Sequence, residues 1–123
     1  MRFAKFAAVF AFVLLAAPAA LAADAGNGKT IFARCAACHT VVKGGGNGLG
    51  PNLFGVVGRK AASLPSYMYS SALKGSGITW TNDKIKTWIM GPQRLVPGTK
   101  MSFGGLSSPS QADDVVAYLD TLK

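Results

Sequence analysis

The sequence predicts one small all-α domain of about three to five short helices and long loops that enclose a bound group. Short segments carry apolar residues at helical spacing, and no segment shows the apolar–polar alternation of a strand. Gly, Pro and Ser interrupt the chain between these segments. A third observation is the run Cys-Ala-Ala-Cys-His at residues 35–39, which places three strong ligand side chains within five residues.

The first half of the domain is expected to contain one helix and a long irregular stretch. Ile31, Phe32 and Cys35 recur at helical spacing and predict a helix from about Gly28 to Ala37. The glycine-rich residues 44–51 exclude a regular element and predict a loop. Residues 52–79 are expected to be irregular, with one helical turn near residues 70–73.

Capping residues mark a helix in the second half. Thr81 or Asn82 can cap a helix that contains Ile85, Trp88 and Ile89. The dipeptide Gly-Pro at residues 91–92 is expected to end it.

A loop and a final helix complete the domain. Residues 95–103 contain Pro and Gly and are expected to form a loop. Ser108 can act as the N-cap of the last helix, with Pro109 at its first position and Gln111 completing a capping box. This helix is expected to run to about Leu122, because its apolar residues form one stripe.

The motif at residues 35–39 is the attachment signature of a c-type haem. Each thiol adds to one of the two vinyl groups on a porphyrin edge, so Cys35 and Cys38 must lie about one helical turn apart. The adjacent His39 then lies under the ring and offers a nitrogen to the iron.

Three other interpretations of the motif are weaker. A thioredoxin-like redox pair needs a βαβ context, which the chain does not show. A structural zinc site needs four ligands, whereas the chain has two Cys, one His and five acidic residues that are all Asp. A plain disulfide in an exported protein is the remaining alternative.

The first residues have the organisation of a secretory signal peptide. Two basic residues precede an apolar run over residues 6–17, and small residues follow with a predicted cleavage near Ala22/Ala23. We therefore expect a leader over residues 1–23 and a haem domain over residues 24–123, exported to the periplasm. An uncleaved N-terminal anchor is the alternative, although the run is shorter than the roughly 20 residues of a membrane span.

The chain is basic, with a formal net charge of +8, which falls to +6 when Arg2 and Lys5 leave with the leader. The positive charges are dispersed, and no basic run of the kind that binds nucleic acid is present. This balance favours steering toward an acidic protein partner, with at most peripheral contact to an anionic membrane surface.

A six-coordinate haem needs a second axial ligand, and the chain has no histidine besides His39. Met68, Met90 and Met101 are the soft candidates in the domain. Met101 lies in a loop stiffened by Pro and Gly, but its position alone does not distinguish it from a core methionine.

Together these motifs resemble class I cytochrome c, close to the mitochondrial type and its bacterial cytochrome c2 relatives. The resemblance covers roughly residues 26–122, and order and spacing both match. The motifs that carry it are Gly28-Lys29, Ile31-Phe32, Cys35 to Thr40, Gly50-Pro51-Asn52-Leu53, Gly58-Arg59-Lys60, Gly77-Ile78-Thr79-Trp80, Pro97-Gly98-Thr99-Lys100-Met101 and Ala117-Tyr118-Leu119.

The resemblance implies a role for each site residue. Cys35 and Cys38 carry the thioether bonds to one haem c, His39 and Met101 bind its iron, and the Pro51 carbonyl accepts the other ring N–H of the histidine.

Further residues are implied to hold the rest of the haem. Arg59, Tyr69 and Trp80 bind the buried propionates, Thr99 orients the methionine loop and Phe103 covers the haem edge.

The resemblance also implies the function of a monomeric one-electron carrier, not an enzyme. Its expected partners are redox proteins with acidic docking faces, such as a bc1-type complex, a terminal oxidase, a photosynthetic reaction centre or a periplasmic dehydrogenase. The alternatives are a small peroxidase-like haem enzyme and a membrane-tethered subunit of a larger complex.

Two positions depart from the mitochondrial-type pattern beside the methionine. Trp88 stands where that pattern has a tyrosine, and Leu73 stands where it has an asparagine. Neither side chain can replace the lost acceptor, so we expect a drier pocket and a shifted reduction potential.

Overall fold

The computed structural model describes residues 3–5, 7–13 and 22–123. Residues 3–5 and 7–13 of the predicted leader form no helix or strand and are exposed. Arg2, Phe6 and residues 14–21, which include the end of the predicted apolar run, lie outside the described residues. Within the described ranges, no helix has the length and apolar character needed to span a membrane.

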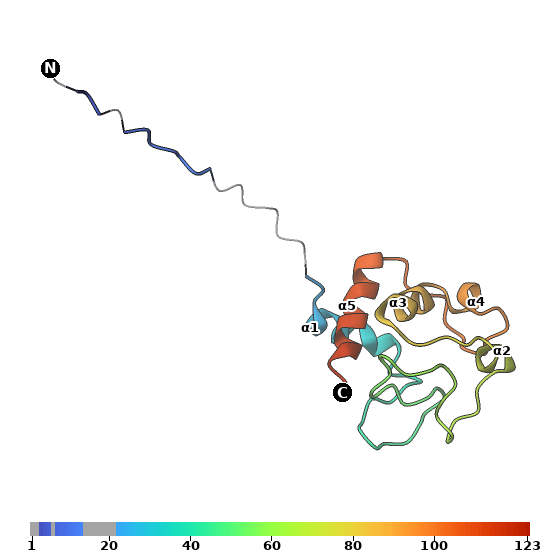
Figure 1. The fold of residues 1–123 in the computed structure, drawn as a ribbon. Coiled ribbons are helices and arrows are strands. Elements are labelled where there is room, and N and C mark those ends of the chain that lie inside the picture. Colours follow the sequence, from blue (N-terminus) through green and yellow to red (C-terminus); the bar gives the residue numbers. More distant parts are fainter. Residues whose placement is uncertain (1–2, 6, 14–21) are drawn as a thin grey trace.

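The all-α prediction is confirmed for the part of the chain that the structure describes (Figure 1). Its only β-type pairing there is an isolated bridge between Lys60 and Thr79. The elements in that part are α1 (Ala25–Ile31), a 3-10 helix (Phe32–Arg34), α2 (Ser71–Lys74), α3 (Asn82–Met90), α4 (Pro92–Leu95) and α5 (Pro109–Asp120).

The predicted bounds of the first helix, Gly28 to Ala37, are wrong at both ends. Helix α1 begins at Ala25 because the Asp24 side chain accepts a hydrogen bond from the Asn27 N–H and so caps the first turn. That turn is polar, so the apolar pattern did not include it. At its end the chain tightens into the 3-10 helix and reaches Cys35 in a turn.

The caps of the later helices are confirmed. Thr81 accepts a hydrogen bond from the Lys84 N–H at 3.2 Å at the start of α3. At the start of α5, the Ser108 hydroxyl accepts a hydrogen bond from the Gln111 N–H. This helix ends at Asp120 and not at the predicted Leu122. Helix α4 was not predicted, because the proline that ends α3 also starts the next helical turn.

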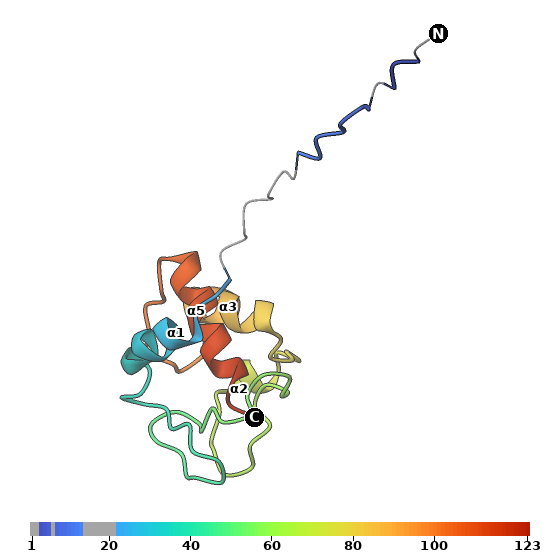
Figure 2. The same cartoon turned by 90° about the vertical axis from the view of Figure 1, so that its left-hand side faces the viewer.

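Helices α1 and α5 cross at very close range (Figure 1). A Cβ atom added to Gly28 would lie 1.9 Å from the backbone oxygen of Asp114, so only glycine fits at this crossing. One turn further, the Phe32 and Tyr118 rings pack with centroids 5.3 Å apart. Figure 2 shows the same crossing after a quarter turn.

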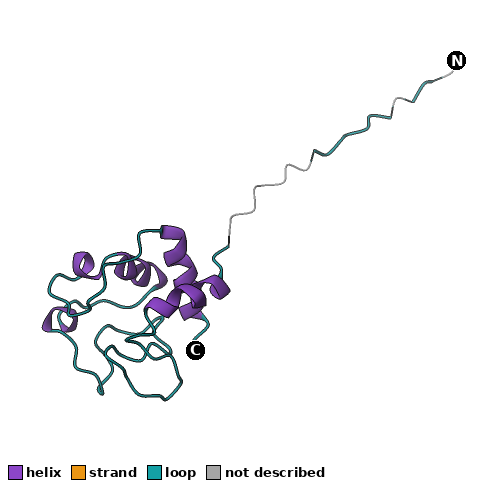
Figure 3. Ribbon diagram, turned by 180° about the vertical axis from the view of Figure 1, so that it is seen from behind, coloured by secondary structure: helices purple, strands orange, loops and turns teal. Residues whose placement is uncertain are grey.

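The helices and the long loops occupy different parts of the domain. Helices α1, α3 and α5 lie together on one side, and the irregular residues 40–69 form the other side (Figure 3). The buried core joins both: it includes Ile85 and Val115 from the helices and Val56 from the loops. The space between the two sides is a cavity lined by residues of both.

Candidate functional site

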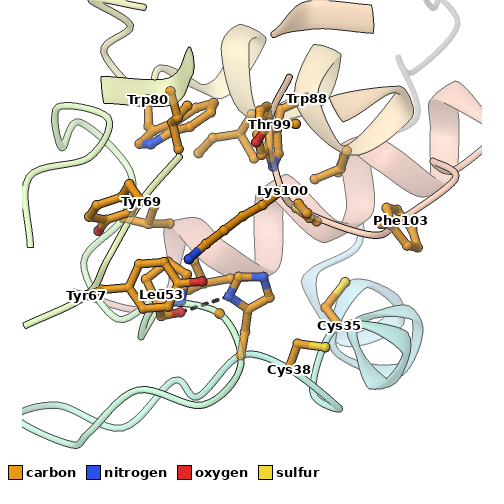
Figure 4. Close-up of a pocket in the computed structure, with 18 of the residues that line it drawn as sticks. Cys35, Cys38, Leu53, Tyr67, Tyr69, Trp80, Trp88, Thr99, Lys100 and Phe103 are labelled. Atoms are coloured by element: carbon orange, nitrogen blue, oxygen red, sulfur yellow. Dashed lines mark hydrogen bonds between the residues drawn. The ribbon is translucent and has the colours of Figure 1, made fainter. Parts of the chain in front are cut away.

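A cavity of about 410 Å³ lies between the helices and the loops (Figure 4). This volume is within the roughly 300–1,000 Å³ that small-molecule and cofactor sites occupy. The structure brings every predicted site residue to its wall: Cys35, Cys38, His39, Pro51, Arg59, Tyr69, Trp80, Thr99, Met101 and Phe103.

Both thiols lie at one edge of this cavity (Figure 4). The turn that carries them is closed by a hydrogen bond from the His39 N–H to the Cys35 carbonyl at 2.9 Å. Burial raises the pKa of the Cys35 thiol, while the positive charge of Arg34 acts in the opposite direction. Cys35 and Cys38 form no disulfide with each other, so both sulfurs are available to react with a bound group.

The His39 ring is fixed by a backbone carbonyl. Its Nδ1 lies 2.8 Å from the Pro51 oxygen, and since a carbonyl only accepts, Nδ1 carries the hydrogen and Nε2 keeps its lone pair. Burial lowers the pKa of His39, with the Pro51 hydrogen bond acting against it, which favours the neutral imidazole that binds metals. A Cβ atom at Gly50 would lie 2.5 Å from the His39 Cε1, so the loop packs directly on the ring.

Asn52 holds this loop, and the sequence reasoning assigned it no role. Its Nδ2 donates to the carbonyls of Val42 at 2.7 Å and Gly45 at 3.0 Å, and its Oδ1 accepts from the Phe54 N–H at 2.9 Å. These bonds fix the backbone next to Pro51. The only signal in the sequence was the position of Asn52 inside the Gly-Pro-Asn-Leu motif.

Among the methionines that the structure describes, Met101 alone lines the cavity. Met68 is 78% exposed and Met90 lies outside the wall. The backbone before Met101 is held from helix α4, because the Gln93 side-chain amide donates to the Thr99 carbonyl. The sequence indicated the loop but not this Gln93 contact.

Lys100 also lines the cavity. Its side chain runs toward Tyr67 (Figure 4), with Nζ 4.7 Å from the centroid of the Tyr67 ring. The ammonium also donates to the Met68 carbonyl. Lys100 therefore ties the methionine loop to the irregular segment on the other side of the cavity.

The residues expected at the propionates lie away from the two cysteines: Figure 4 shows Tyr69 and Trp80 on the opposite side of the cavity from Cys35 and Cys38. Arg59 shares this wall and donates to the Asn52 carbonyl at 3.0 Å.

The polar groups of this wall can still bind an anion. Burial lowers the pKa of Arg59, with Tyr69 acting in the opposite direction. The Tyr69 hydroxyl accepts from the Leu64 N–H at 3.4 Å, which leaves its own hydrogen free to donate.

The two departures from the family pattern both lie in the wall. Trp88 packs edge-on against Trp80, with centroids 5.2 Å apart and planes at 66°. Leu73 is buried and contributes no polar atom. The wall near Thr99 is therefore more apolar than a tyrosine and an asparagine would make it.

Comparisons with known proteins agree with this geometry. The profile of the family named Cytochrome c matches residues 25–123. A cytochrome c2 of Rhodoblastus acidophilus is 45% identical over 102 residues, covering 83% of this chain and 95% of its own. A cytochrome c of Arabidopsis thaliana is 43% identical over 101 residues, covering 81% of this chain and 90% of its own.

A solved structure is similar as well. It is cytochrome cH from Methylobacterium extorquens, with a TM-score of 0.75 and 48% identity over 80% of this chain and 98% of that one.

The matching family implies a covalently bound c-type haem with iron. The residues present fit that group. Two free thiols at one edge suit two thioether bonds, a neutral imidazole with a fixed tautomer suits iron, and hydrogen-bond donors at the far side suit two carboxylates. The rest of the wall is mainly apolar, as a porphyrin face requires.

Proposed function

The chain belongs to the cytochrome c family, and on that premise we propose that it moves single electrons between redox proteins through a haem whose iron lies between His39 and Met101. The relatives are electron carriers and not enzymes, and this chain shares their family over residues 25–123.

One observation supports the proposed ligand pair. A single cavity holds both thiols of the attachment motif, the only histidine of the chain and, among the described methionines, Met101 alone. If His39 and Met101 both bound the iron, they would leave no open position for a substrate. A peroxidase-like reaction would also need a distal acid–base residue, and the chain has no second histidine for that role.

The haem supplies an iron that alternates between Fe(II) and Fe(III), and the chain sets the conditions for it. Pro51 keeps the His39 ring in one tautomer and orientation. Gln93 holds the loop that presents Met101, a ligand type that raises the reduction potential. Trp88 and Leu73 make the adjacent wall apolar, which favours the less charged ferrous site over the ferric one.

The compartment and the partners are part of the same proposal. The leader over residues 1–23 would carry the chain to the periplasm, where covalent haem attachment takes place in bacteria. The net positive charge favours partners with acidic docking faces, such as a bc1-type complex, a terminal oxidase, a reaction centre or a periplasmic dehydrogenase. Association with such a partner should weaken as ionic strength rises.

The optical spectrum of the oxidised protein tests the ligand pair. The protein is produced in a periplasm that contains haem-attachment machinery, and the weak near-infrared band of methionine sulfur bound to ferric haem is recorded. We expect the band in the wild type and in Met68→Ala, which changes an exposed methionine. We expect its loss in Met101→Ala. A high-spin wild-type spectrum without the band would bring the enzyme interpretation forward.

A further inference from the structure

The start of helix α1 is tied to helix α5 by one carboxylate. The backbone N–H of Asp24 donates to Asp114 Oδ1 at 2.8 Å, and the Asn27 side-chain amide donates to Asp114 Oδ2 at 2.7 Å. Both oxygens of Asp114 are therefore engaged by the first residues of the domain. The contact joins positions 90 residues apart in the chain.

Asp24 also lies at the predicted end of the leader. Helix α1 begins at Ala25, and Asp24 is its N-cap. Ala22 and Ala23 precede the helix, belong to no helix or strand and are exposed. Ala22 and Ala23 are both small enough to precede the cleaved bond of a signal peptide, and cleavage after Ala23 makes Asp24 the N-terminus.

We propose that removal of residues 1–23 turns the Asp24–Asp114 hydrogen bond into an ion pair that fastens α1 to α5 in the mature protein. Hydrolysis of the Ala23–Asp24 peptide bond consumes one water, leaves a carboxylate on Ala23 and frees the Asp24 nitrogen as an α-ammonium. That nitrogen already lies 2.8 Å from Asp114 Oδ1, so the pair forms without rearrangement. The inference rests on the proposed leader and not on the axial ligands.

The charges around the Asp24 nitrogen favour the ammonium form. Asp24 and Asp114 are nearest, and the adjoining groove is also lined by Asp83 from α3 and by Asp113 and Asp120 from α5. All five acidic residues of the chain therefore lie beside this point.

Two positive groups near the Asp24 nitrogen act against these carboxylates. Lys86 lines the groove, but its ammonium is paired with Asp113 at 2.8 Å. The positive end of the short α1 dipole also disfavours an ammonium, and the capping carboxylate of Asp24 counters it. The same two hydrogen bonds keep the pKa of Asp114 below its usual range, so the carboxylate is charged wherever the amine is.

The ion pair has a defined consequence for the fold. The neighbouring contact of α1 on α5 is the backbone approach at Gly28. An ion pair at Asp24 would be a second contact that holds the start of α1 on α5. The same helix leads into the segment that carries Cys35. Processing of the chain would thus strengthen an existing contact at the start of the helix that leads to the haem-attachment motif.

The test uses the holoprotein purified from the periplasm. Mass spectrometry gives the N-terminus, and a proton titration followed by NMR gives the pKa of the α-amino group. The ordinary range is roughly 7.7–8.0, and pairing with a carboxylate is expected to raise the pKa above that range. Asp114→Asn should return the α-amino pKa to the ordinary range. Asp113→Asn, which removes a neighbouring charge but not the contact, should leave most of the shift.

Stability against pH gives a second reading. A base whose pKa is raised by folding stabilises the protein below its unfolded pKa, and this contribution is lost as the pH rises through the folded pKa. The urea midpoint of Asp114→Asn should therefore lie below that of the wild type at about pH 7, and part of this gap should close by about pH 10.5.

Several outcomes would overturn the inference. They are an N-terminus other than Asp24, an α-amino pKa in the ordinary range, and a gap between wild type and Asp114→Asn that does not change with pH. None of these bears on the near-infrared test of Met101, so a failure here and a failure of the proposed ligands are distinguishable.

Discussion

The α1–α5 crossing and the loops of residues 40–69 enclose the same cavity but are held in different ways. The crossing depends on shape: Gly28 admits the backbone of α5, and Val115 is only 1% exposed beneath it. The loops contain no helix or strand within residues 40–69 and depend on a few polar side chains that reach backbone groups, above all Asn52. The crossing should therefore be most sensitive to added volume at Gly28, whereas the loops should be most sensitive to the loss of these polar contacts.

The largest effect is expected from Gly28→Ala at the crossing. The new Cβ atom would lie 1.9 Å from the Asp114 backbone oxygen, which cannot move without shifting α5. Overpacking of this kind should lower the free energy of unfolding by about 3 kcal/mol, measured by urea titration of the holoprotein.

Gly26→Ala is the matched control in the same helix. Its Cβ atom would approach only the Asp24 Oδ1, at 3.2 Å, which is the end of a side chain that can yield. Alanine has the higher helix propensity, so Gly26→Ala should cost little or stabilise α1, and a loss as large as that of Gly28→Ala would show that the close crossing does not set the cost.

Asn52→Ala should give the next largest effect, in the loops. It leaves the carbonyls of Val42 and Gly45 and the N–H of Phe54 without their partner, which should cost about 2 kcal/mol. Hydrogen exchange should accelerate at residues 42–54 and remain slow in α5.

Asn82→Ala is the control for Asn52→Ala, because it removes one exposed hydrogen bond to Asp120. If Asn52→Ala accelerated hydrogen exchange equally in residues 42–54 and in α5, the loops and the helix crossing would not be stabilised independently.

Gly50→Ala tests the contact of the loop with the His39 ring. Its Cβ atom would meet the His39 ring at 2.5 Å, so either the ring turns away from its hydrogen bond to Pro51 or the loop shifts. We therefore expect a smaller loss of stability, about 1.5 kcal/mol, together with a disturbed haem spectrum. Gly46→Ala, whose Cβ atom would meet nothing within 4 Å, should change neither. A normal spectrum in Gly50→Ala would mean that the loop moves instead of the ring.

The smallest effects are expected from the helix caps. Ser108 caps α5 and Ser70 caps the four-residue α2, and each alanine variant should lose about 1 kcal/mol or less. Ser108→Ala should lower the global unfolding free energy, while Ser70→Ala should open α2 locally in hydrogen exchange. Ser107→Ala, next to the α5 cap, serves as control. Equal exchange patterns in Ser108→Ala and Ser70→Ala would contradict the expected difference between a global effect at α5 and a local effect at α2.

The same contrast explains what the sequence could predict. Caps and apolar stripes are local, so the starts of α3 and α5 were predicted correctly from Thr81 and Ser108. The sequence does not predict the start of α1, because its first turn has no apolar pattern, nor α4, because Gly91-Pro92 indicates only the end of a helix.

In the site, motif spacing predicted the wall residues but not what holds them. Asn52 and Gln93 reach carbonyls six to ten residues away, and Lys100 reaches one 32 residues away, through contacts that only the folded loops create.

Ligation of the haem iron by His39 and Met101 is tested most directly by NMR of the reduced protein with ¹³C-labelled methionine methyl groups. The ring current of the haem shifts a methyl group bound above the iron far upfield of all others. We predict one such resonance, absent from Met101→Ala and present in Met68→Ala. A spectrum with no shifted methyl group, or one that loses it in Met68→Ala, would contradict the proposed ligand pair.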